Sequence, residues 1–197
     1  MGPFGTSRCS TILGVLIDRF MPEFDVSEHH LIRVQAPAER TYTAARDLDL
    51  ARSAVVRSLS ALRGISGLVR RRPPHRRSMT FDDLVQAGFV WLADEAPTEM
   101  VLGVAGTFWR PSGGVVRMAA AEFESFDREG CAKAAWNFHV VPVDEGTSIV
   151  TTETRVRVPD DESRRRFMLY WAAIGPFSGV IRRQALGLVR NAAEGRG

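Results

Sequence analysis

One stretch near the C-terminus decides the fold: Val158-Pro-Asp-Asp-Glu-Ser-Arg-Arg-Arg-Phe-Met-Leu-Tyr-Trp171, whose pattern continues to Ala193. Mostly apolar or small residues recur along it at alternating steps of four and three, the spacing that gathers side chains on one stripe of a helix. The stripe consists of Phe167, Trp171, Ile174, Ser178, Ile181, Ala185, Leu188 and Ala192. The pattern therefore predicts one long amphipathic helix.

The stripe is large and aromatic at its start and small at its end. A helix that only caps a sheet more often carries a uniform face of Leu and Val. We therefore expect the aromatic end to roof a space and the small end to seal a core. Pro176 lies within the helix and removes one backbone hydrogen bond, so a bend is expected there.

Length and composition are those of an ordinary globular protein. The chain has 197 residues, of which 45% are hydrophobic and 25% charged, enough for one domain with a sizeable core. Cys9 and Cys131 form no CxxC or Cys/His cluster, so neither a disulfide framework nor a metal site is predicted, and a reducing compartment is favoured. A net charge of +3 permits acidic partners without arguing for them.

The N-terminal region is predicted to lie outside the main domain. Its apolar run, residues 11–17, is too short to span a membrane, and no signal cleavage site follows it. We interpret residues 1–24 as a leader with a short helix over 12–20, and residues 25–194 as a single ligand-binding domain. A cytoplasmic location is expected.

The remaining patterns give an order of elements. Period-2 and helical patterns predict a strand, two helices, a charged loop, a short helix and then a run of antiparallel strands before the long helix. The strand ranges are 29–36, 89–93, 99–105, 107–110, 115–126, 131–141 and 147–158. The earlier helix ranges are 37–48, 51–65 and 80–85, and the charged loop runs from Arg70 to Arg77. The sequence thus predicts an α+β fold.

This order resembles the helix-grip fold of the START/Bet v 1-like, or SRPBCC, superfamily. Three segments are similar to uncharacterised bacterial members: Phe20-Met-Pro-Glu-Phe-Asp-Val26, Thr152-Glu-Thr-Arg-Val156, and Phe167 with Tyr170-Trp171 and Ile181-Arg-Arg183. The resemblance implies a curved antiparallel sheet of about six to seven strands around the last helix. It also implies a cavity that commonly holds a lipid, a polyketide or another apolar molecule. These members share no catalytic motif.

Alanines on the predicted strands bear on the size of such a cavity. Ala119, Ala120 and Ala121 follow one another, and the next strand carries Ala132, Ala134 and Ala135. Because alanine is a poor strand former, the cluster is consistent with space being left. Alternatively, the alanines meet bulky partners such as Trp171.

Candidate wall residues come from one strand face and from the long helix. Trp136, Phe138 and Val140 share a strand face, which we expect to point inward. With Phe167, Tyr170, Trp171 and Ile174 they would line the cavity; alternatively, each is ordinary core.

Glu153 and Arg155 face opposite to Thr152, Thr154 and Val156. If they face inward, they form a buried pair that could orient the polar end of a ligand. If the apolar face is inward, they form a solvated pair of little energetic value. Period 2 alone leaves both alternatives open.

Three functions follow from these patterns. The first is binding of an apolar or amphipathic small molecule without a cofactor. The second is a cyclase or dehydratase of the polyketide type, for which Glu153 is the candidate acid or base. The third is contact with a membrane surface or nucleic acid through residues 70–77, which is disfavoured because no interleaved aromatics accompany the arginines.

Overall fold

A computed structural model gives the structure of the protein and describes residues 15–53, 78–110 and 114–196. Most of the helix predicted over 51–65 lies outside these residues, as do the arginine-rich segment 70–77 and the leader 1–10.

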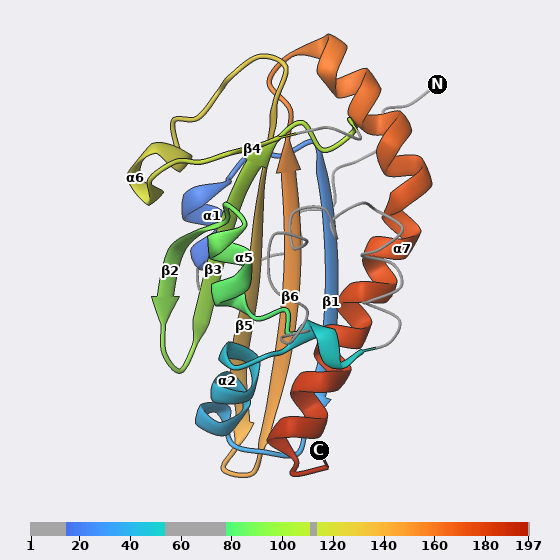
Figure 1. Ribbon diagram of the computed structural model, residues 1–197. Helices are drawn as coiled ribbons and strands as arrows, with labels where there is room; N and C mark the ends of the chain where they lie inside the picture. The colour runs from blue at the N-terminus through green and yellow to red at the C-terminus, as the bar shows by residue number, and fades with distance from the viewer. Residues whose placement is uncertain (1–14, 54–77, 111–113, 197) are drawn as a thin grey trace, which may run out of the picture.

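A six-stranded antiparallel sheet forms the centre of the fold (Figure 1). Its order is β1-β6-β5-β3-β2, with the short β4 paired to β3. The strands are β1 (Val26–Val34), β2 (Val90–Glu95), β3 (Glu99–Gly106), β4 (Val115–Val116), β5 (Ala132–Asp144) and β6 (Thr147–Arg157). The long β5–β6 hairpin supplies the middle of the sheet and therefore most of the surface on which the helices pack.

Helix α7 (Asp161–Ala193) runs along one side of the sheet, and Figure 1 shows it curving past the strands. It begins after Asp160, whose carboxylate accepts a hydrogen bond from the Ser163 backbone N–H at 2.8 Å, a standard N-cap. The other helices are α1 (Leu16–Phe20), α2 (Ala38–Arg46), the 3-10 turn η1 (Leu50–Arg52), α5 (Phe81–Gln86) and α6 (Ala120–Phe123). The predicted α+β class, with one sheet and a long last helix, is confirmed, and the arrangement is that of a helix-grip fold.

Two predicted strands are wrong. Residues 107–110 form a turn, closed by a hydrogen bond from the Arg110 N–H to the Thr107 carbonyl. Of residues 115–126, only Val115–Val116 pair with β3, and the alanine run enters α6 instead. The reason is local: alanine favours helix over strand, and the Glu122 carboxylate accepts a hydrogen bond from the Ala119 N–H at 2.7 Å.

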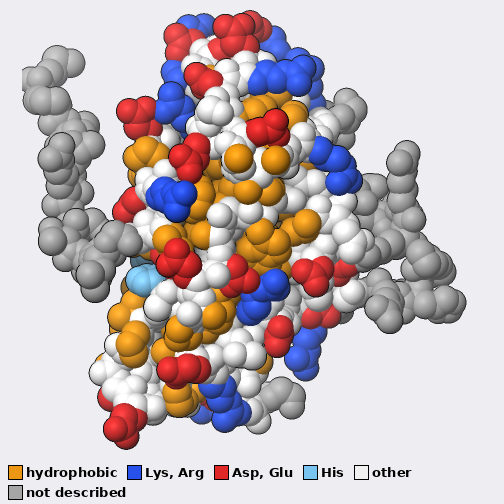
Figure 2. Space-filling view, turned by 90° about the vertical axis from the view of Figure 1, so that its left-hand side faces the viewer, with side chains coloured by type: hydrophobic (Ala, Val, Ile, Leu, Met, Phe, Trp, Pro, Cys, Tyr) orange, Lys and Arg blue, Asp and Glu red, His pale blue; other side chains and the backbone are white. Residues whose placement is uncertain are grey.

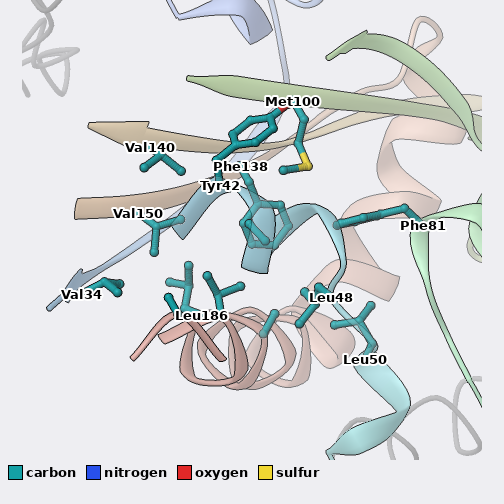
Figure 3. Packing of buried hydrophobic residues seen from close by; sticks show 14 of the residues in the cluster. Val34, Tyr42, Leu48, Leu50, Phe81, Met100, Phe138, Val140, Val150 and Leu186 are labelled. Carbon is teal, nitrogen blue, oxygen red and sulfur yellow. The ribbon is translucent and has the colours of Figure 1, made fainter. Parts of the chain in front are cut away.

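The sheet has an inner face, which packs on α7, and an outer face, which packs on α1. On the inner face, side chains from β1, β5 and β6 and from α2 and α7 fill one end of the layer (Figure 3). This core includes Val34, Tyr42, Met100, Phe138, Val140, Val150 and Leu186, all at most 5% exposed. The C-terminal half of α7 therefore seals a closed core.

The buried stripe of α7 departs from the predicted one past Ser178. The inward residues there are Ile181, Ala185, Leu186, Val189 and Ala193, whereas Ala192 is exposed and Leu188 is half-buried. A pattern of alternating fours and threes averages 3.5 residues per turn, but an unsupercoiled helix has 3.6, so the stripe rotates by about 20° per seven residues. The strict repeat therefore leaves the inward face by the last turns.

Candidate functional site

A cavity of about 240 Å³ lies between the inner face of the sheet and the N-terminal half of α7. Its floor comes from β3, β5 and β6, its roof from α7, and its sides from η1, α5, β4 and the residues next to them. The floor residues are Val104, Ala134, Trp136, Thr154 and Val156; the roof residues are Phe167, Tyr170, Trp171, Ser178, Ile181 and Arg182; the sides include Leu50, Met79, Leu84, Phe89, Phe108 and Val115. This cavity wall is mostly apolar, as is typical of small-molecule sites.

Four of the predicted wall residues meet at this cavity: Trp136, Phe167, Tyr170 and Trp171. The aromatic end of the α7 stripe thus lies over the cavity and its small end over the core. Phe167 is 1% exposed, and its ring packs against Trp171 at 5.8 Å and against Tyr170 at 6.1 Å between ring centroids. The roof is therefore built from mutually packed rings, which hold one another in place.

Trp136 is held in a fixed orientation on the floor. Its indole N–H donates to the Thr152 hydroxyl at 2.7 Å, and the Arg182 guanidinium lies 4.2 Å from the ring centroid. The Phe81 ring packs against it at 5.6 Å between centroids. With these contacts, Trp136 presents a rigid aromatic surface to the cavity.

Three other predicted wall residues lie elsewhere: Phe138, Val140 and Ile174. Val140 is buried in the closed core. Phe138 is fully buried in the closed core beside Phe81 and Trp136, because it stands two residues along β5 toward the end that α2 covers (Figure 3). Ile174 is half-exposed and is not part of the cavity wall.

Of the alanines, only Ala134 lies on the cavity floor. Ala135 faces the opposite side of the sheet, and Ala120 and Ala121 belong to α6. Space in the cavity therefore comes from one strand position rather than from the whole alanine cluster.

Sequence reasoning did not identify the polar wall residues Thr154, Ser178 and Arg182 as candidates. Thr154 pairs in register with Trp136, so the strand alternation that placed Trp136 inward could have placed Thr154 beside it. Arg182 is one turn of helix beyond Ser178 on the same side of α7. No such signal was available for Phe89 or Phe108, which reach the cavity through tertiary contacts.

Glu153 and Arg155 face away from the cavity, on the outer face of the sheet, so the structure does not bring them together with the other predicted site residues. The reason is that the alternate residues Thr152, Thr154 and Val156 occupy the inner face of β6. The pair is nevertheless not solvated, because α1 and the residues after it cover this part of the sheet. Arg155 is 8% exposed and bonds to Glu153 at 2.8 Å and to the Met21 carbonyl at 2.9 Å.

Arg155 thus contacts the chain just after the C-terminal end of α1, and a second buried group, Glu99, contacts the N-terminal end of this helix. Its carboxylate accepts hydrogen bonds from the Leu16 N–H at 2.7 Å and from the Asn137 side-chain amide at 2.6 Å, with a longer contact to the Ile17 N–H. Burial raises the pKa of the Glu99 carboxyl above its ordinary value, while its hydrogen bonds to Asn137, Leu16 and Ile17 oppose the shift. Glu99 and Arg155 thus fix α1 at both ends.

Replacing Glu99 with glutamine is expected to lower the free energy of unfolding by about 1–3 kcal/mol, because an amide N–H₂ would face backbone or side-chain donors. Urea denaturation measures the change. Glu95→Gln, the same substitution at the exposed end of β2, is the matched control and should change stability by less than about 0.5 kcal/mol. Equal effects of the two substitutions would contradict the role of Glu99.

The same carboxyl predicts a pH effect of defined sign. Because its folded-state pKa lies above the ordinary 4.5, the folded protein binds the Glu99 proton more tightly than the unfolded chain does. The contribution of Glu99 to stability is therefore greatest below pH 4.5 and declines as the pH rises through the raised pKa. The difference between wild type and Glu99→Gln in stability across this range should show that decline.

The face seen in Figure 2, on the side of β2 and α6, carries acidic and basic side chains interspersed with apolar ones. A surface that binds nucleic acid through phosphates gathers Lys and Arg on one face, and the described residues on this face show no such gathering. Within the described residues no group of three or more His, Cys, Asp or Glu side chains could hold a metal ion. None of the described helices combines the length and apolar character that crossing a bilayer requires.

No protein-family model matches the chain, and no curated protein matches its sequence. Among solved structures, the chain is similar to the Zhui aromatase/cyclase from a Streptomyces species, with 12% identity and a TM-score of 0.30 over 87% of this chain and 94% of that one. It is also similar to a protein from Thermus thermophilus, with 10% identity and a TM-score of 0.29 over 87% of this chain and 96% of that one. At these values the two similarities add nothing to the argument from the site.

Proposed function

We propose that this protein binds an apolar or amphipathic small molecule in the cavity under α7. The observation that carries the proposal is an apolar cavity wall with a roof of packed aromatic rings, next to a core that is otherwise closed. A volume of about 240 Å³ is just below the usual range for drug-sized ligands, about 300–1,000 Å³, so the ligand is expected to be small. Membership of the START/Bet v 1-like superfamily is part of the same proposal.

Binding is favoured over turnover by the chemistry of the wall. The described wall residues include no Asp, Glu or His, the side chains that most often act as general acid or base. Glu153, the candidate for a cyclase or dehydratase reaction, faces α1 instead. His139, whose pKa is lowered by burial, alternates along β5 with the inward-facing Phe138 and so lies on the outer face.

Filling the cavity should abolish binding without unfolding the protein. We expect Ala134→Leu to weaken the binding of naphthalene at least tenfold, because the added carbons occupy the floor, while the melting temperature stays equal or rises. Isothermal titration calorimetry and thermal unfolding measure the two effects.

Ala172→Leu is the matched control, since Ala172 is exposed on the outer side of α7. It should leave the affinity within twofold. Native mass spectrometry of the protein as purified adds a direct test, because bound ligand would appear as extra mass. Wild-type protein that binds neither naphthalene nor any co-purified ligand would contradict the proposed function.

A further inference from the structure

A buried hydroxyl without a hydrogen-bond partner lies on the cavity floor. Thr154 is 6% exposed, and its Oγ1 is buried and makes no hydrogen bond to any residue that the structure describes. Buried polar atoms are nearly always paired, because leaving one unpaired costs free energy. The position of Thr154 on the cavity floor therefore calls for an explanation.

The neighbouring inward threonine on β6 shows what a paired hydroxyl looks like here. Thr152 Oγ1 donates to the Asn137 carbonyl at 2.7 Å and accepts from the Trp136 indole N–H at 2.7 Å. Thr154 lies one step along the same face, opposite Trp136 in register, but that indole is already engaged. The two positions differ in their surroundings: Thr152 lies in closed packing, whereas Thr154 faces the cavity.

A second unpaired oxygen lies beside Thr154. Glu28 on β1 is its register partner across the sheet, and Glu28 Oε2 is buried without a hydrogen bond among the described residues. The other carboxylate oxygen bonds to His30 at 3.0 Å and lies against the α7 backbone, where a Cβ added at Gly179 would be 2.4 Å away. Gly179 follows Ser178, a polar wall residue, whereas Glu28 itself is not part of the cavity wall. Thr154 is therefore the unpaired group that faces the cavity.

We infer that the ligand of this cavity carries a hydroxyl group, an alcohol or a phenol, which hydrogen-bonds to Thr154. This inference rests on the proposed binding function and specifies the ligand class. A hydroxyl both donates and accepts, so it matches the Thr154 hydroxyl in either direction. A pure hydrocarbon would leave the Thr154 oxygen unpaired.

The test compares 2-naphthol with naphthalene, two probes of the same ring system that differ in one hydroxyl. We expect Thr154→Val, which keeps the shape of the side chain, to lower the affinity for 2-naphthol about fivefold to tenfold. Naphthalene should be unaffected or should bind slightly tighter. Thr151→Val, on the same strand but the outer face, is the matched control and should change neither affinity. Isothermal titration calorimetry gives all the constants.

Thermal unfolding of the ligand-free protein gives an independent readout. Because Thr154→Val removes an unpaired buried hydroxyl, the melting temperature should rise by about 2–4 °C. A fall would mean that water already satisfies the hydroxyl, and would overturn the inference. Equal changes for the two probes would overturn it as well and leave the binding function standing. Absence of binding of both probes to the wild type would overturn the inference and the function together.

Discussion

Phe167→Ala is expected to destabilise the protein by about 3–5 kcal/mol and to enlarge the ligand cavity at the same time. Phe167 is 1% exposed and belongs to the aromatic end of the roof, with its ring 5.8 Å from Trp171 and 6.2 Å from Trp109 between centroids. Removing the ring forfeits its burial and its aromatic contacts, and the space left joins the existing cavity. Urea denaturation measures the loss of stability.

Although Phe167→Ala lowers stability, the enlarged cavity should improve the binding of larger ligands. The ratio of anthracene affinity to naphthalene affinity should be higher in the variant than in the wild type. Anthracene has three rings, and the added space next to the floor can hold the third one. Calorimetric titration with both probes measures the ratio. A ratio that does not change would mean that the roof collapses onto Val156 and Trp171, and the position of Phe167 in the wall would then not determine ligand size.

Phe177→Ala is the matched control for this prediction. Phe177 is on the same helix but 41% exposed, so its truncation should cost less than about 1 kcal/mol and leave the probe ratio unchanged. An equal loss of stability in Phe167→Ala and Phe177→Ala would contradict the assignment of Phe167 to the buried side of α7 and of Phe177 to the exposed side.

The sequence predicts the long helix and most of the order of elements along the chain because both depend on periodicity. The α7 stripe is visible from residue 167 onward, and its aromatic start and small end correspond to two environments along one helix, the cavity roof and the core. Its precise facing is not visible, because a strict repeat of 3.5 and a real helix of 3.6 residues per turn diverge past Ser178. Neighbouring Leu186, rather than Leu188, is therefore the buried leucine.

The sequence cannot predict what covers the second face of a sheet. Alternation separates Trp136 and Phe138 from Asn137 and His139, but it does not show that cavity and core share one face, which is why Phe138 was expected at the cavity. It also offers only ligand or solvent as surroundings for Glu153 and Arg155. The observed surroundings, a short N-terminal helix more than 130 residues away in sequence, arise from a long-range contact that no local pattern encodes.

Arg155→Met is expected to lower the free energy of unfolding by about 2–4 kcal/mol. The guanidinium bonds to the Met21 carbonyl at 2.9 Å, to Asp18 at 2.7 Å and to Glu153 at 2.8 Å. Breaking a buried ion pair from one side leaves the partner charge uncompensated, which costs about 3–5 kcal/mol in full burial. The expected value is lower here because the Asp18 side chain is 53% exposed and regains water.

Arg157→Met is the matched control, since Arg157 lies two residues along the same strand face and its partner Glu23 is 78% exposed. Its loss should cost less than about 1 kcal/mol. Hydrogen exchange should show faster opening of α1 in Arg155→Met than in Arg157→Met, because only Arg155 bonds to the Met21 carbonyl just beyond the end of α1.

The decisive measurement is naphthalene affinity in Arg155→Met under conditions where the variant is folded. The inner and outer faces of β6 are separated by the sheet itself, so the outer-face charge network can be broken while the cavity floor keeps Thr154 and Val156 in place. We therefore expect an affinity within twofold of wild type despite the large loss of stability. A tenfold loss of affinity in the folded variant would mean that Arg155 acts on the ligand after all, and would contradict the assignment of the two faces. Stability and binding then become separable properties of one strand: Glu153 and Arg155 hold α1, whereas Thr154 and Val156 form part of the ligand floor.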